Sequence, residues 1–81
     1  MIEELEGDKI SEAVDSYVVL YMKEIGKFVG KVLWVDEEKC LMRYEVMSGP
    51  NKGHERTGRY KPNRPYKRYD EESLVKAFFE K

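Results

Sequence analysis

An α+β fold is predicted for this chain: a small antiparallel β-sheet or β-barrel followed by a C-terminal helix. Two stretches between residues 28 and 47 are rich in strand-forming residues and are joined by a polar turn, which is typical of a β-hairpin. An apolar stretch with acidic residues at its start closes the sequence, which indicates a helix. With 81 residues, the chain has room for one domain with a small core.

The predicted hairpin is the clearest local pattern. Residues 28–35 are rich in β-branched and aromatic side chains, and residues 36–39 form a polar turn. Residues 40–47 then alternate, with Cys40, Met42, Tyr44 and Val46 on one apolar face. Gly30, inside the first strand, predicts a bulge or a tight bend.

The segment before the hairpin is compatible with two structures. Its apolar residues recur at helical spacing from residue 10 to residue 25, and Gly26 could end such a helix. The run over residues 17–22 instead has strand propensity, and residues 23–27 would then be a hairpin loop. We favour the strand. Residues 1–9 are expected to form an acidic head, frayed or folded as a single turn.

The segments after the hairpin complete a β core over residues 17–60. Residues 48–53 have the composition of a loop, and a short strand could follow near residues 55–60. Residues 61–69 contain two prolines, which favour an extended path. A final helix is expected over residues 70–80, with Asp70 or Ser73 as its cap.

Residues 17–36, read as strands and turns, resemble the opening of a Tudor-type domain, one of the SH3-like small barrels. The resemblance covers about 30 of the 81 residues when it is extended to Val46. Residues 46–53 are also similar to the loop of the KOW motif, found in other SH3-like barrels. The Tudor resemblance implies an aromatic cage for methylated side chains. Its rings would be Tyr21, Phe28, Trp34 and Tyr44, which could equally form the core of a small barrel.

Charge is segregated along the chain although the net charge is only -1. Residues 1–26 carry seven acidic side chains and two lysines, whereas residues 51–68 carry seven basic side chains and one glutamate. Such asymmetry indicates interaction faces of opposite sign. An alternative needs no partner, because the acidic head and the basic segment (residues 51–68) could face each other within the fold.

The stretch from residue 59 to residue 69 combines five cations, three tyrosines and two prolines. Cations neutralise phosphates and tyrosine rings stack on unpaired bases, but arginine and tyrosine are also frequent anchors in protein interfaces. The residues predicted to bind a protein partner or a nucleic acid are Lys52, Arg56, Arg59, Tyr60, Lys61, Arg64, Tyr66, Lys67 and Arg68.

Catalysis and cofactor binding have little support in the sequence. His54 is the sole histidine, Cys40 is expected on the apolar face of a strand, and no Gly-x-Ser-x-Gly turn occurs. One histidine and one cysteine 14 residues apart lack the paired spacing of a metal site. No apolar run is long enough to span a membrane, no secretory signal is expected, and the single cysteine fits a reducing, cytoplasmic compartment.

Two functions remain for a non-enzymatic chain of this kind. The first is a small interaction module that docks on a larger protein assembly through the basic aromatic segment, in the manner of phage-encoded modulators or inhibitors of host machinery. The alternative is an SH3-like module that binds RNA or single-stranded DNA. The near-neutral net charge favours the first.

Overall fold

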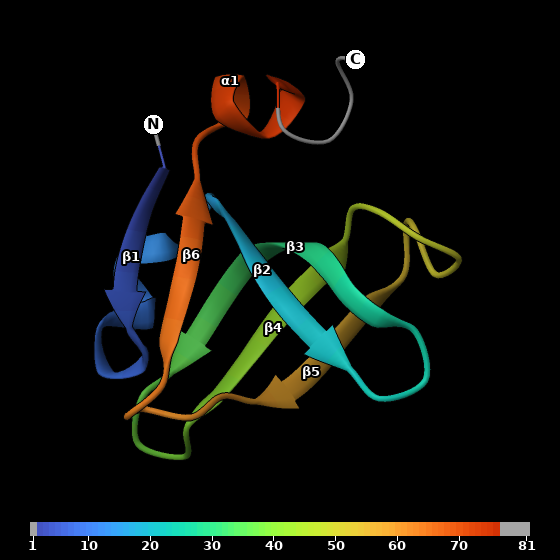
Figure 1. Ribbon diagram of the computed structural model, residues 1–81. Coiled ribbons are helices and arrows are strands. Elements are labelled where there is room, and N and C mark those ends of the chain that lie inside the picture. Colours follow the sequence, from blue (N-terminus) through green and yellow to red (C-terminus); the bar gives the residue numbers. More distant parts are fainter. Residues whose placement is uncertain (1, 77–81) are drawn as a thin grey trace.

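The computed structural model describes residues 2–76 and shows a six-stranded antiparallel sheet with a short C-terminal helix (Figure 1). The elements, in chain order, are β1 (Ile2–Glu6), the 3₁₀ helix η1 (Gly7–Ala13), β2 (Tyr17–Met22), β3 (Gly26–Asp36), β4 (Leu41–Val46), β5 (Glu55–Arg59), β6 (Pro65–Tyr69) and α1 (Glu71–Leu74). The strand order is β1-β6-β2-β3-β4-β5, so β1 and β5 are the two edges and the sheet is not closed.

The predicted hairpin between residues 28 and 47 is confirmed as β3 and β4. The side chains of Met42, Tyr44 and Val46 are buried on one face, as the alternation predicts. Cys40 was expected within the strand, and this is wrong: it ends the turn, with φ at 55°. The bulge lies between Val32 and Trp34 rather than at Gly30. Gly30 instead lets Leu20 and Tyr44 pack over the backbone, because a Cβ there would lie 2.8 Å from Leu20 Cδ1.

Within residues 10–25, the strand favoured for residues 17–22 is confirmed as β2, and the alternative of a helix that continues to residue 25 is wrong. Helix η1 covers the first part and buries Ile10 and Ala13, whereas β2 covers the strand-forming run. The helical periodicity is interrupted at Asp15, where φ is 67° and the chain reverses. There the Asp15 N–H donates to the Val32 carbonyl at 2.8 Å, and the Val32 N–H donates to Ser16 at 3.0 Å.

The acidic head is not frayed over residues 2–6, which form strand β1. This strand pairs with β6 over its whole length, with Glu3 opposite Arg68 and Glu4 opposite Lys67. The Arg68 guanidinium also forms an ion pair with the Glu3 carboxylate. The interpretation that the acidic head faces the basic segment is therefore confirmed for this part of the chain.

The C-terminal part of the basic segment is also a strand. Residues 65–69 form β6, which lies between β1 and β2 (Figure 1), and Pro65 occupies its first position, where a proline is tolerated. Helix α1 begins after Asp70, whose carboxylate accepts the Ser73 N–H at 2.8 Å. The part of the predicted helix beyond residue 76 lies outside the described residues.

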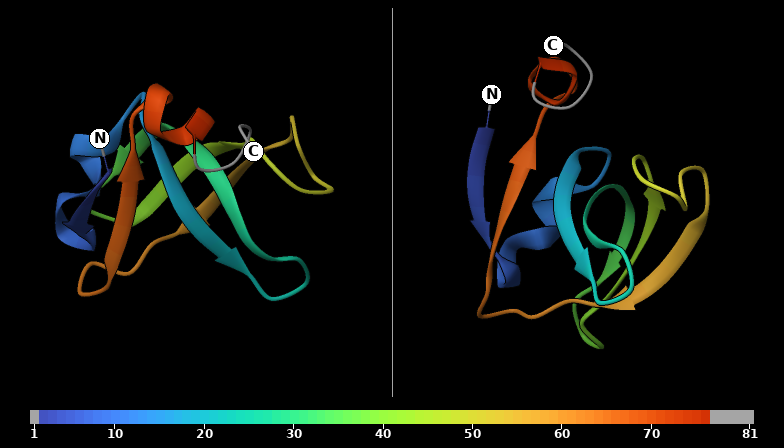
Figure 2. Two further views of the ribbon diagram at one scale, coloured as in Figure 1. Left: turned by 45° about the horizontal axis from the view of Figure 1, so that its top comes forward. Right: turned by 45° about the vertical axis from the view of Figure 1, so that its right-hand side comes forward.

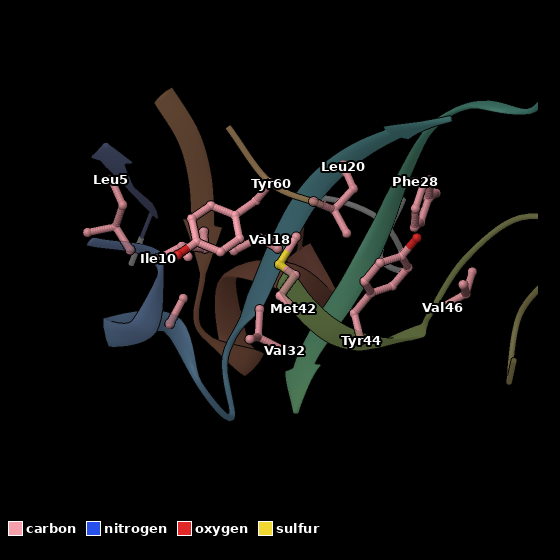
Figure 3. Close-up of a cluster of buried hydrophobic side chains, with 11 residues drawn as sticks. Leu5, Ile10, Val18, Leu20, Phe28, Val32, Met42, Tyr44, Val46 and Tyr60 are labelled. Atoms are coloured by element: carbon pink, nitrogen blue, oxygen red, sulfur yellow. The ribbon is translucent and has the colours of Figure 1, made fainter. Parts of the chain in front are cut away.

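The sheet separates two apolar clusters. The larger lies on the face that we call the inner face and includes Ile10 of η1, Val18, Phe28, Val32 and Tyr44 (Figure 3). On the opposite, outer face, Leu74 of α1 packs against Val29 and Tyr69. Figure 2 shows the sheet curled, with α1 beyond the end of β6. Among the described residues, no helix is long and apolar enough to cross a membrane.

Gly7 joins the N-terminal segment to the loop between β5 and β6. Its N–H donates to the Arg64 carbonyl at 2.8 Å, and the N–H of Asp8 donates to the Pro62 carbonyl at 2.8 Å. A Cβ on Gly7 would lie 1.9 Å from the Lys61 carbonyl oxygen and 2.9 Å from Pro62 Cα. Because these atoms belong to the backbone, no side-chain rotation would relieve the clash.

We therefore expect Gly7→Ala to lower the free energy of unfolding by about 1–3 kcal/mol, the usual cost of inserting atoms where the backbone must move. Urea unfolding followed by circular dichroism measures the change. The matched control is Gly58→Ala in β5, where the nearest atom to an added Cβ is 3.5 Å away. Equal stability of the two variants would contradict the close approach at Gly7.

Candidate binding site

A cavity of about 270 Å³ opens between the inner face of the sheet and the loop that leads to β6. Its apolar part comes from Leu20 on β2, Met42 on β4 and Gly58 on β5. Its remaining lining consists of four aromatic and three basic residues: Tyr21, Phe28, Tyr44, Tyr66, Arg59, Lys61 and Arg64. The cavity thus combines rings and cations, the two residue types that the sequence singled out.

The basic loop at this cavity is held in place by backbone hydrogen bonds. Residues 61–64 form a turn in which the Arg64 N–H donates to the Lys61 carbonyl at 3.2 Å. The Lys61 N–H donates to the Tyr66 hydroxyl at 3.0 Å, and Gly7 and Asp8 bind the loop from the other side. These contacts use main-chain groups of the loop and leave its cationic side chains exposed.

The cavity has a positive electrostatic character, because three of its lining residues are cationic and none is acidic. Within residues 2–76, no ion pair engages Arg59, Lys61 or Arg64. Burial raises the pKa of Tyr44 in the cavity floor, and the nearby Arg56 guanidinium offsets part of this rise. The Tyr44 hydroxyl therefore stays protonated at neutral pH and can donate a hydrogen bond. The site is suited to an anionic partner.

The four rings proposed for an aromatic cage are not all at one place. Phe28 and Tyr44 are buried against each other, with ring centroids 5.7 Å apart, and Tyr21 is 67% exposed at the rim. Trp34 does not line this cavity, which corrects the four-ring grouping. The bulge before Trp34 places it opposite Arg43, on the outer face, where it is 44% exposed. Tyr66 is the fourth ring at the cavity.

The other predicted partner-binding residues are distributed over the molecule. Lys52 lies in the loop between β4 and β5, Arg56 lies on the edge strand β5, and Lys67 and Arg68 lie on β6. Of these, Arg68 is engaged by Glu3. Tyr60 is only 3% exposed and belongs to the inner cluster, so it is a core residue rather than a surface contact.

Lys27 was missed as a candidate residue. The sequence places it in a hairpin loop, but it lies within β3, opposite Tyr21, and borders two further cavities. Its position next to Phe28, at the start of a run rich in β-branched and aromatic residues, is the pattern that could have placed it in the strand. Leu20 and Met42 were also missed, because apolar strand residues do not distinguish a cavity floor from a core.

The only histidine and the only cysteine of the sequence lie at opposite ends of the β4–β5 pair. The His54 carbonyl accepts the Val46 N–H, whereas the Cys40 carbonyl accepts the Tyr60 N–H at the other end. Because they lie at opposite ends of this strand pair, His54 and Cys40 do not form a nucleophile–base pair.

Comparisons of the chain with protein-family models, curated proteins and solved structures find no match.

Burial also raises the pKa of Tyr60, and the nearby Cys40, Glu37, Asp36 and Asp8 raise it further as negative charges. An unfolded chain releases this proton near pH ~10, whereas the folded protein holds it to higher pH. The stabilising contribution of the protonated phenol is therefore complete below pH ~10 and is lost as the pH rises toward the folded-state pKa.

We expect the free energy of unfolding to fall more steeply above pH ~10 in the wild type than in Tyr60→Phe, which keeps the ring but removes the titrating hydroxyl. Urea unfolding at a series of pH values between 8 and 11 measures both slopes, and the points near pH 8 serve as the internal reference. Parallel slopes would contradict the role assigned to Tyr60.

Proposed function

We propose that this protein is a non-enzymatic interaction module that docks on an acidic surface of a larger protein assembly. The observation that carries the proposal is the cavity lined by rings and by Arg59, Lys61 and Arg64, with no acidic residue in its lining. Arginine and tyrosine are the residue types most often found as anchors in protein interfaces. None of these three cations forms an ion pair in the part of the chain that the structure describes, and such cations attract an acidic surface and accelerate encounter with it.

The distribution of the remaining cations supports a localised contact rather than a long basic track. Arg68 is taken up by the ion pair with Glu3, and Lys67 lies opposite Glu4 in the β1–β6 register. Lys52 and Arg56 lie outside the cavity lining. A nucleic acid gains affinity when many cations are spread along its backbone. Such a localised group of cations therefore adds less to the affinity for a nucleic acid than to the affinity for a compact acidic patch.

A module for RNA or single-stranded DNA is the second candidate, and the exposed ring of Tyr21 beside the cavity cations favours it. Binding by stacking needs several accessible ring faces along the strand. Phe28 and Tyr44 are instead buried in the inner cluster. The balance therefore favours a protein partner.

The proposal includes an SH3-like architecture and a cytoplasmic setting. Support for the architecture comes from strands β2 to β5, which follow one another as a meander, and from β6, which returns beside β2. Support for the setting comes from a single cysteine, which lacks a partner for an internal disulfide. A role as a phage-type modulator or inhibitor of host machinery fits a small, highly charged docking module of this kind.

Reversal of two cavity charges tests the docking function. We expect Lys61→Glu/Arg64→Glu to weaken partner binding about tenfold or more, because neither side chain forms an ion pair within residues 2–76 and both are exposed to a partner. The control is Lys9→Glu/Lys39→Glu, which changes the net charge equally at exposed positions outside the described cavity linings. The partner is identified by affinity capture and mass spectrometry, then purified for titration.

Fluorescence anisotropy with labelled single-stranded DNA, duplex DNA and RNA at two salt concentrations separates the two candidates. The docking function predicts weak binding to all three and tight binding to one acidic protein. Micromolar binding to single strands that weakens steeply with salt, and that the Lys61→Glu/Arg64→Glu variant loses, would replace it with the nucleic-acid function. A partner that binds the variant and the control equally would place the interface elsewhere.

A further inference from the structure

Strand β5 leaves one side of its backbone unpaired. It forms one edge of the sheet, pairs with β4 on its other side, and lies at the rim of the curled sheet in Figure 2. Four of its five residues are exposed, and Gly58 is half-buried. Unpaired N–H and C=O groups along an edge strand are a template for another strand. The residues whose backbone groups face outward therefore decide which strand fits.

Hydrogen bonds at the ends of the β4–β5 ladder identify these residues. The Val46 N–H donates to the His54 carbonyl at 2.8 Å, so the even-numbered residue at this end directs its groups toward β4. In an antiparallel ladder the direction alternates along each strand, and the β4–β5 register is regular throughout β5. The N–H and C=O groups of Glu55, Thr57 and Arg59 therefore face outward. Within residues 2–76, no backbone hydrogen bond engages them on that side.

This edge is complementary to a second copy of itself. When two copies of β5 pair antiparallel about Thr57, each Glu55 lies opposite Arg59 of the other copy. Opposite charges that face each other across a strand pair stabilise it. The same pairing places each Arg56 opposite Gly58 of the other copy, and glycine has no side chain with which the arginine could collide.

The charges of both residues are available for this pairing. Arg59 forms no ion pair in the part of the chain that the structure describes. The Glu55 side chain is 51% exposed, and its Oε1 accepts the Nε of Arg43 at 3.1 Å. Because a carboxylate accepts through both of its oxygens, Oε2 can accept from Arg59 of the second copy. The pairing thus adds contacts without breaking one that the fold already makes.

The neighbouring registers of two β5 strands are less favourable. Sliding one strand by two residues in one direction places Arg56 opposite Arg56 of the other copy, and like charges directly opposite each other are destabilising. Sliding it in the other direction carries Glu55 beyond the end of the second β5 and removes both opposite-charge pairs. The sequence of β5 therefore selects the register centred on Thr57.

The other edge of the sheet, β1, is not complementary to itself. The Gly7 N–H donates to the Arg64 carbonyl in register with the β1–β6 pairing, so the even-numbered residues of β1 face outward. Two copies of β1 that pair about their central residue would place Glu4 opposite Glu4. Because like charges repel across a strand pair, β5 is the edge that fits a second copy.

We propose that β5 is the interface of a two-fold symmetric dimer, in which two six-stranded sheets join through antiparallel β5 strands centred on Thr57. Main-chain hydrogen bonds of Glu55, Thr57 and Arg59 hold the two strands together, and the two Glu55–Arg59 pairs fix their register. A standard interface uses roughly 20 residues from each side, whereas this strand pairing uses five. The dimer is therefore weak, and its population depends on concentration. This inference goes beyond the docking function and does not depend on it.

Two complementary charge variants test this interface. Arg59→Glu would set acidic side chains opposite each other in its own dimer, and Glu55→Arg would set basic side chains opposite each other, whereas a mixture of the two variants restores both opposite-charge pairs. Sedimentation velocity at concentrations from about 10 µM to about 1 mM measures dimerisation of each sample. The matched control is Lys9→Glu, a charge reversal at an exposed position of η1. Circular dichroism verifies that each variant is folded.

We expect the wild type and the Lys9→Glu control to dimerise alike. Each β5 variant alone should dimerise about tenfold more weakly or worse, because it replaces two attractive pairs by two repulsive ones. The mixture of the two variants should regain dimerisation. A wild type that stays monomeric, an Arg59→Glu variant that dimerises like the wild type, or a mixture of folded variants that stays monomeric overturns the proposal.

NMR of the wild type locates the interface without any substitution. In dilute solution the Thr57 amide should exchange quickly and the Arg56 and Gly58 amides slowly, and a rise in protein concentration should protect Thr57. In a mixture of labelled and unlabelled copies, an NOE should connect Arg56 Hα with Gly58 Hα of the other copy, because the Cα atoms of such a non-hydrogen-bonded pair lie about 4.5 Å apart. Self-association that leaves the Thr57 amide unprotected, or that protects the outward-facing amides of β1 instead, overturns the pairing through β5.

The dimer and the docking function fail separately. Arg59 borders both the candidate cavity and the edge of β5, whereas Lys61 and Arg64 follow β5 in the chain. The Lys61→Glu/Arg64→Glu variant keeps every residue of β5, so it should lose the acidic partner and still dimerise like the wild type. Loss of the dimer in this variant would place the interface between copies at the cavity and overturn the pairing through β5.

Discussion

The return of β6 into the sheet between β1 and β2 is the constraint on which the rest of the structure depends. It gives β1 its only strand partner in the sheet and brings residues more than 60 positions apart into register, as Glu3 and Arg68 show. Closing a loop of this length costs little more free energy than closing a shorter loop, since the loss of chain entropy grows only with the logarithm of loop length. Pairing on both sides of β6, together with the close approach at Gly7, offsets that cost.

The same constraint divides the basic segment into cations with different roles. Where β6 runs along β1, Arg68 and Lys67 lie opposite acidic residues of the N-terminal strand. Before β6 begins, the chain crosses from β5 in a loop whose backbone is tied down while Lys61 and Arg64 remain exposed. The basic residues thus fall into cations that lie opposite acidic residues of β1 and exposed cations of the candidate site, and Pro65 separates the two groups.

Strand β2 pairs with β6 over a short stretch only, although it pairs with β3 along its whole length. That strand is paired throughout with β3, which curls so that Leu20 and Phe28 pack into the inner cluster. Strand β6 is paired throughout with β1 and cannot follow the curl, since each strand pair adds its own twist. The two ladders therefore share only one end, and two cavities lie between β2 and β6 where these strands diverge.

The sequence by itself determined the features that depend on neighbours in the chain. Alternation in residues 40–47 correctly assigned Met42, Tyr44 and Val46 to a buried face, and the composition of residues 17–22 favoured the strand that forms there. Single-residue irregularities cannot be predicted in this way. The bulge before Trp34 turns its side chain to the outer face, and the positive φ of Cys40 places this residue in the turn before β4.

Only the tertiary structure decided which candidate residues are available to a partner. Nothing local marks residues 2–6 as a strand, since their burial and pairing depend on β6, and nothing local shows that Tyr60 is a core residue while Tyr66 lines a cavity. The physical reason is that the residue pattern of a segment reflects which of its two faces contacts solvent. Whether a charged side chain is free or paired depends instead on which distant segment the fold places beside it.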